Sequence, residues 1–132
     1  MKRGKKGMNL QTIPRPEHPQ PQMQREDWTN LNGEWNFYID YGNSGEDRKL
    51  YKNTELPDRI IVPFCPESRC SGVGNTDFMP AVWYQKKLML KKDLNGRRLL
   101  LHFGAVDYAC SVWLNGEPVG EHRGGYSSFT FD

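Results

Sequence analysis

The sequence predicts an all-β fold, an antiparallel β-sandwich of the jelly-roll kind. Roughly six or seven short apolar segments are separated by turns about every 8 to 15 residues. The 132-residue chain contains 13 glycines and 9 prolines, which favour turns and interrupt helices. No helical periodicity extends beyond about two turns, so long helices are not expected.

The chain is predicted to begin with a basic, proline-rich arm, residues 1–26, before a folded domain at residues 27–132. Its prolines disfavour helix and central strand and favour an extended, polyproline-like chain. The arm is either a disordered tail or a segment that lies across a neighbouring domain. Its basic residues are Lys2, Arg3, Lys5 and Lys6, and its central prolines are Pro14, Pro16, Pro19 and Pro21.

The first half of the domain contains two predicted strands and a long loop. Trp35, Phe37 and Ile39 alternate with polar residues, which is the period of a strand with one buried face. Residues 59–64 form a short strand that ends at Pro63. Residues 65–80 are rich in turn residues and read as an irregular loop.

The second half contains further predicted strands, at residues 83–90, 99–106, 111–114, 118–121 and 128–131. Residues 99–106 are apolar on both faces, so we expect this strand to be central in its sheet. Asn95-Gly96 marks a turn, and Asn115-Gly116 predicts a hairpin, because both positions of a type I′ turn need positive φ. The last strand runs directly into Asp132, so we predict that the sandwich is incomplete at its C-terminus.

Composition argues against several classes of protein. The net charge is +2, and the basic surplus lies in the first six residues, so a nucleic-acid-binding surface is not expected. No apolar stretch has the length of a membrane span, and no apolar segment follows the basic start as in a secretory signal. Three cysteines, an odd number, favour free thiols and a cytoplasmic location.

Four residues are candidates for contact with a substrate: Trp83, Asp107, Tyr108 and His122. Trp83 begins a strand beside the long loop, where a tryptophan either faces a ligand or packs in the core. Asp107 and Tyr108 follow the predicted central strand; the alternative for Asp107 is a buried carboxylate that anchors backbone N–H groups. His122 is included for its position near a loop.

Neither a metal nor a cofactor is expected. Cys65 and Cys70 lack the second pair of ligands that a structural zinc site needs, and they read as loop thiols. Cys110 lies in a strand pattern that favours a buried, inert thiol, and His102 reads as a hydrogen-bonded core or inter-domain histidine. Gly124-Gly125 lacks the context of a phosphate loop and reads as a turn that needs positive φ.

Several motifs occur in the order and spacing of one known family. The chain resembles the N-terminal sugar-binding domain, a galactose-binding-like jelly roll, of glycoside hydrolase family 2, which includes β-galactosidases, β-glucuronidases and β-mannosidases. Several motifs in register are far more specific than one. The matching segments are LNGEWNF at residues 31–37, VPFCPES at 62–68, VWY at 82–84, LHFGAVDY at 101–108, VWLNG at 112–116 and VGEHRGGYSSF at 119–129.

The resemblance implies a non-catalytic role for this chain. In that family both catalytic glutamates belong to a later TIM barrel, which follows an immunoglobulin-like domain, and hydrolysis retains the anomeric configuration. The chain is then expected to support that barrel and the substrate rim of a β-galactosidase-like homo-oligomer acting on a β-linked sugar. In one branch of the family an Asp after the Val-Gly turn contacts the sugar, whereas glycine stands there in this chain. The alternative is a stand-alone carbohydrate-binding or assembly module.

Overall fold

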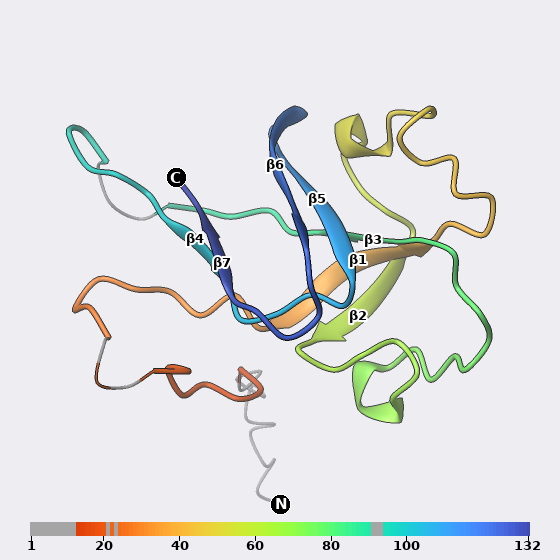
Figure 1. Cartoon of the computed structure of the whole chain (residues 1–132), viewed down its shortest axis with the longest axis horizontal. Coiled ribbons are helices and arrows are strands. Elements are labelled where there is room, and N and C mark those ends of the chain that lie inside the picture. Colours follow the sequence, from red (N-terminus) through yellow and green to blue (C-terminus); the bar gives the residue numbers. More distant parts are fainter. Residues whose placement is uncertain (1–12, 21, 23, 91–93) are drawn as a thin grey trace, which may run out of the picture. The chain divides into compact units, whose positions relative to one another are not determined.

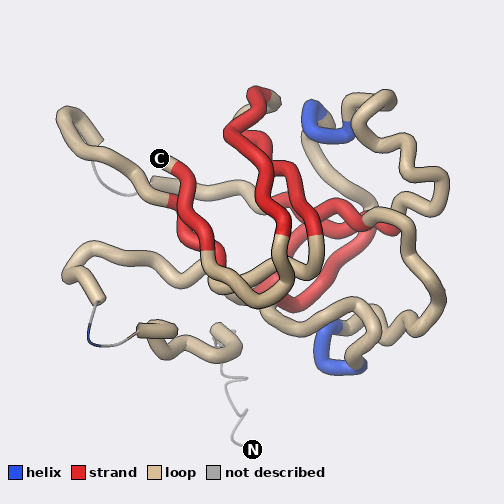
Figure 2. The backbone as a smooth tube through the Cα atoms, in the orientation of Figure 1, coloured by secondary structure: helices blue, strands red, loops and turns tan. Residues whose placement is uncertain are grey.

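The structure is a computed structural model that describes residues 13–20, 22, 24–90 and 94–132. The basic residues at the start of the predicted arm lie outside this part of the chain. The described residues form an all-β chain with two single-turn 3₁₀ helices, η2 (Leu50–Lys52) and η3 (Arg69–Ser71) (Figures 1 and 2). Its strands are β1 (Gly33–Ile39), β2 (Asp58–Val62), β3 (Val82–Gln85), β4 (Leu101–Phe103), β5 (Ala109–Leu114), β6 (Glu117–Arg123) and β7 (Phe129–Phe131).

The strands of the described residues form three small sheets. Their orders are β2-β1-β3, β4-β7 and β5-β6. The pairs β1–β3, β4–β7 and β5–β6 are all antiparallel. The predicted all-β, antiparallel class is therefore confirmed.

The period-2 pattern of the first predicted strand is borne out at its centre. Phe37 in β1 is only 1% exposed. It lies opposite Tyr84 of β3, and the two rings meet edge to face with centroids 5.2 Å apart. Leu50 and Leu56 are also buried, so this sheet has an apolar face that excludes water.

The Asn115-Gly116 hairpin is confirmed. Asn115 and Gly116 have φ values of 52° and 81°, as a type I′ turn requires. The turn sets the register of β5 and β6, with Leu114 opposite Glu117. An irregularity between Val112 and Trp113 shifts the pairing by one residue further along.

Two predicted strands differ from the structure. β3 ends at Gln85 instead of residue 90, because its ladder with β1 stops at the pair Asn36–Gln85. The predicted central strand is reduced to Leu101–Phe103, which pairs with β7 in a sheet of two strands among the described residues. An apolar pattern indicates an extended chain that favours burial, but a strand also needs a hydrogen-bonding neighbour.

Of the two alternatives for His102, the core position was wrong, and the inter-domain position stays a prediction. This residue lies on β4, where its side chain is exposed. The hydrogen bond expected of it is present, since Nδ1 lies 2.7 Å from the hydroxyl oxygen of Thr130 on β7. In a sheet of two strands both side chains of such a cross-strand pair can remain open to water, as His102 and Thr130 do.

The chain divides into two compact units. One takes the chain up to Trp35 together with Arg59–Asp77, and the other takes Asn36–Asp58 together with Phe78–Asp132. In the first unit, the side-chain amide of Asn32 donates to the backbone oxygen of Pro14 at 3.1 Å, and the rings of His18 and Trp28 meet edge to face. Part of the proline-rich segment is thus held to residues 28–32 within this unit.

Candidate functional site: a cluster at the strand ends

Of the four candidate residues, Trp83 is held inside its own unit by a buried carboxylate. Its indole Nε1 donates to Oδ2 of Asp40 at 3.3 Å, and Asp40 is 1% exposed. The same carboxylate accepts hydrogen bonds from the backbone N–H groups of Ser44, at 3.2 Å, and Gly45, at 2.7 Å. Asp40 therefore ties the end of β1, the following turn and β3 together.

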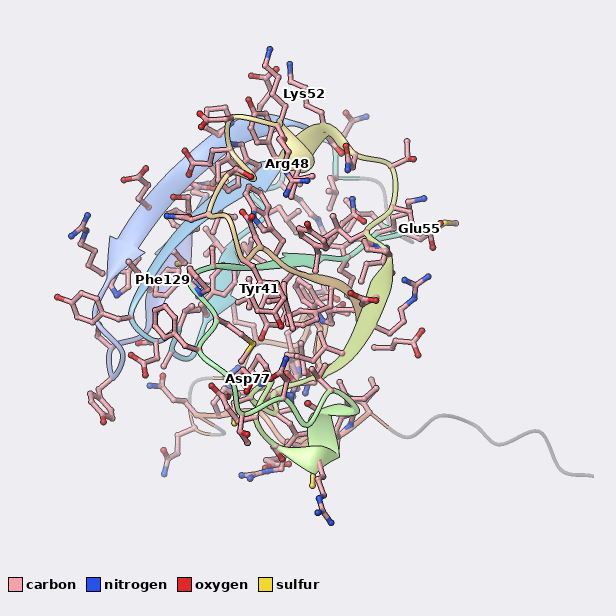
Figure 3. The ribbon with its side chains drawn as sticks, turned by 90° about the vertical axis from the view of Figure 1, so that its right-hand side faces the viewer. Tyr41, Arg48, Lys52, Glu55, Asp77 and Phe129 are labelled. Carbon is pink, nitrogen blue, oxygen red and sulfur yellow. The ribbon has the colours of Figure 1, made fainter. Side chains whose placement is uncertain are left out.

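The charge of Asp40 is stabilised although the residue is buried. Burial is the largest influence and by itself would raise the pKa of this carboxyl. The hydrogen bonds from Ser44, Gly45 and Trp83, together with the positive charge of Arg48, outweigh burial and hold the pKa of Asp40 below its usual value. Arg48 lies 3.4 Å from Asp40 Oδ1, on the same segment as Lys52 (Figure 3).

Trp113 and Gly45 both pack closely against the Trp83 ring. Trp83 stacks on Trp113 with centroids 5.2 Å apart, and Trp113 stacks on Tyr51 at 5.1 Å. Gly45 is buried so closely against the indole that a Cβ atom there would overlap the ring. The structure therefore places Trp83 in a packed aromatic stack, which is the core-packing alternative for this residue.

The other three candidates come together at one end of the β5–β6 hairpin. The connections β4–β5 and β6–β7 run side by side there (Figure 1). The backbone N–H of Gly124 donates to the carbonyl oxygen of Tyr108 at 2.7 Å. We call this group the strand-end cluster; its residues are Asp107, Tyr108, His122, Gly124, Gly125, Tyr126, Ser127 and Phe129.

The glycine turn brings backbone close to the Asp107 carboxylate. Gly124 has φ of 126°, which confirms the positive φ expected of this turn. At Gly125 an added Cβ would lie 2.7 Å from Oδ1 of Asp107, so a side chain there would displace the carboxylate. Asp107 is exposed, so the alternative of a buried anchoring carboxylate does not apply to it; Asp40 has that role.

His122 is oriented by two neighbours in the cluster. Its Nε2 hydrogen-bonds with the hydroxyl of Ser127 at 3.0 Å. Its ring stacks on Phe129 of β7, with centroids 4.1 Å apart and planes 16° apart. Figure 3 shows Phe129 beside the strands of the hairpin. The imidazole is therefore fixed in place, and the loop that carries Ser127 is fixed with it.

Two tyrosines of the cluster project into solvent. Tyr108 is 64% exposed and Tyr126 is fully exposed. Aromatic rings that stay open on an ordered loop are available to a ligand or a partner. Our sequence analysis missed Tyr126, although it directly follows a glycine turn, and loops on a rigid scaffold often carry binding residues.

The three cysteines do not belong to the strand-end cluster. Cys65 and Cys70 are exposed free thiols, as expected, and Cys110 is half-buried, where burial raises the pKa of its thiol. Within the described ranges, no three His, Cys, Asp or Glu side chains are grouped so as to hold a metal ion. In the same ranges, no helix has the length and apolar character of a membrane span.

Comparison with known proteins identifies the family. Residues 28–132 match the sugar-binding domain of the glycosyl hydrolases of family 2. The chain belongs to this family. The match includes the β5–β6 hairpin and the whole strand-end cluster, and the motifs that suggested the resemblance all lie within it or overlap it.

Curated relatives are much longer than this chain. A β-glucuronidase of Bacteroides fragilis is 31% identical over 103 residues, which cover 77% of this chain and 13% of the relative. A β-galactosidase of Thermoanaerobacter pseudethanolicus is 39% identical over 56 residues, which cover 42% of this chain and 8% of the relative. The chain therefore corresponds to a small part of each of these proteins.

Solved structures agree with the fold. A β-glucuronidase of an uncultured Clostridium species matches with a TM-score of 0.65 and 29% identity, over 77% of this chain and 18% of that one. A β-glucuronidase of Ruminococcus gnavus matches with a TM-score of 0.70 and 22% identity, over 79% of this chain and 18% of that one. The strands described here thus have the arrangement of a family 2 jelly-roll domain.

Proposed function

We propose that this chain is the non-catalytic, sugar-binding part of a polypeptide that hydrolyses β-linked glycosides. The observation that carries the proposal is the family match over residues 28–132, together with relatives that are several times longer. In such a polypeptide, an immunoglobulin-like domain would follow this one, and a TIM barrel that carries two glutamates would then perform hydrolysis with retention. The present chain would support that barrel and help to form the substrate rim, and the complete enzyme would be a homo-oligomer.

We place β-glucuronides first among the substrates and β-galactosides second. Matches named β-glucuronidase include the Bacteroides fragilis protein, which aligns over most of this chain. The β-galactoside alternative, our expectation from the motifs, is supported by the 39% identical segment of the Thermoanaerobacter protein. We further propose a reducing, cytoplasmic location, which the odd number of cysteines favours.

Asp107, Tyr108 and His122 are the residues that we assign to the rim. They lie together at the ends of strands, where loops on a rigid scaffold usually carry binding function. Trp83 does not belong to this cluster, since its ring lies in the stack with Trp113.

The proposal is tested on the complete gene product, after the coding sequence beyond the Asp132 codon has been determined. The purified product should hydrolyse p-nitrophenyl β-glucuronide, and its activity on p-nitrophenyl β-galactoside ranks the two substrates. Residues 1–132 alone should release no nitrophenol from either. A complete product that contains no further domains, binds glycans and hydrolyses neither compound would favour the stand-alone carbohydrate-binding module.

A further inference from the structure

The strand-end cluster combines three features that suit the binding of a polar ligand. It has two exposed phenol rings, Tyr108 and Tyr126, on connections that a backbone hydrogen bond joins. It has an exposed carboxylate, Asp107, beside the glycine turn. It also has an ordered frame, because Ser127 and Phe129 hold His122 in place.

We propose that Tyr108 and Tyr126 form a stacking platform for an uncharged pyranose, with Asp107 accepting hydrogen bonds from its hydroxyl groups. A pyranose presents apolar C–H groups on its ring faces and hydroxyls at its edge. Exposed tyrosine rings suit the faces, and a carboxylate, which only accepts hydrogen bonds, suits the hydroxyls. The site rests on the proposed function: it would bind a neutral sugar of the glycoside, other than a glucuronosyl group.

The charge of the cluster decides between neutral and acidic sugars. Asp107 is the acidic residue of the cluster, and a uronic acid placed on the platform would bring a second carboxylate close to it. Arg123 follows His122 on β6, so its side chain points to the opposite face of that strand. Like charges about 6 Å apart near a surface reduce affinity by about threefold or more. The cluster therefore selects against the acidic sugar.

A pair of ligands that differ at one carbon tests this directly. Methyl β-D-glucopyranoside and the corresponding methyl β-D-glucuronide are titrated against the 132-residue chain at pH 7, with binding followed by saturation-transfer NMR. Three variants are compared with the wild type: Tyr126→Ala, Tyr108→Ala and, as a control, Tyr41→Ala, whose side chain is 59% exposed elsewhere in the same unit. Asp107→Asn is added to remove the charge.

The expected results are specific to each variant. Loss of either Tyr126 or Tyr108 raises the Kd for the neutral glycoside about threefold to tenfold, and Tyr41→Ala leaves it unchanged. The wild type prefers the neutral glycoside, and Asp107→Asn reduces that preference. A wild type that prefers the glucuronide, or a Tyr126→Ala variant that binds as the wild type does, overturns the proposal.

Dispersed amide signals in the NMR spectrum establish first that each variant is folded. The same variants in the complete gene product provide a second measurement that does not need the isolated chain. Tyr126→Ala should raise KM for a neutral disaccharide glycoside and leave KM for a p-nitrophenyl glycoside unchanged. Equal effects on both substrates would overturn the platform, whereas a wild-type product without hydrolysis would instead overturn the proposed function.

Discussion

The aromatic stack around Trp83 and the strand-end cluster around Tyr126 use the same kind of side chain in opposite ways. In the stack, Trp83 and Trp113 cover each other, and a buried aspartate takes the indole N–H. In the cluster, hydrogen bonds and a stacked histidine fix the frame but leave two tyrosines open to water. An aromatic ring with both faces covered contributes to stability, whereas an open ring on a fixed frame is available for recognition.

The largest effect is expected from Gly45→Ala in the stack. The new methyl group would overlap the Trp83 indole, which Asp40 and Trp113 prevent from moving aside. Overpacking of this kind costs about 1–3 kcal/mol, and we expect the upper end. Urea unfolding measures the loss of free energy of unfolding.

Gly42→Ala is the matched control for this prediction. An added Cβ at Gly42 would lie no closer than 3.4 Å to a neighbouring atom, Oγ of Ser44. The urea midpoint of unfolding of Gly42→Ala should stay near that of the wild type. If both variants unfold at the same urea concentration, the stack is not tightly packed.

Asp40→Asn should give the next largest loss and change how stability depends on pH. The pKa of Asp40 is lowered in the folded chain, so its contribution is complete above the unfolded value of about 4 and is lost as the pH falls through the folded pKa. Removing the charge should cost about 1.5–3 kcal/mol at pH 7.

Urea midpoints measured between pH 7 and pH 2 test this second prediction. The difference in urea midpoint between the wild type and Asp40→Asn should become smaller as the pH is lowered. Asp47→Asn, at an exposed position on the same turn, should behave as the wild type does at pH 7. A constant difference between the wild type and Asp40→Asn across the pH range would contradict the assignment.

A third prediction compares one variant from each of the two regions. Trp83→Phe loses the indole hydrogen bond and part of the stack, so its free energy of unfolding should fall by about 1–2 kcal/mol. Its affinity for methyl β-D-glucopyranoside should stay unchanged. Tyr126→Ala should show the reverse, with stability within about 0.5 kcal/mol of the wild type and weaker binding. Parallel unfolding and binding curves check both variants.

The smallest effect is expected from Gly125→Ala. Its methyl group would displace the exposed Asp107 carboxylate, which can move into solvent at little cost. We expect a stability change below about 1 kcal/mol and about a threefold weaker binding of the neutral glycoside. Gly104→Ala, where no atom lies within 4 Å of an added Cβ, is the control. Identical binding by the two variants would remove Asp107 from the site.

Local patterns predicted most of the strands but not their neighbours. The Asn115-Gly116 turn and the alternation around Phe37 are properties of a few adjacent residues, and both are present as predicted. The ends of β3 and β4 depend on which segment lies alongside, and no local pattern contains that information. The apolar pattern at residues 99–106 therefore led us to expect a central strand, whereas β4 pairs with β7 in a two-stranded sheet of the described residues.

The same distinction explains the outcome for the candidate site. Asp107, Tyr108 and His122 were selected for their loop and strand-end positions, and the hairpin brings these positions together. Trp83 was selected as a large aromatic residue beside a long loop, but its surroundings are set by Asp40 and Gly45, some 40 residues earlier in the chain. Whether a ring is covered or open is a tertiary property, which is why Tyr126 was missed as well.

A residue-resolved NMR titration of the wild-type chain with methyl β-D-glucopyranoside tests the central contrast most directly. Both regions report in one spectrum, through the backbone amides of residues 124–127 and the indole N–H of Trp83. We predict that the amides of the strand-end cluster shift with a common Kd while the Trp83 indole signal stays in place. A shift of the Trp83 indole with unchanged cluster amides would contradict the account and make the aromatic stack the binding region.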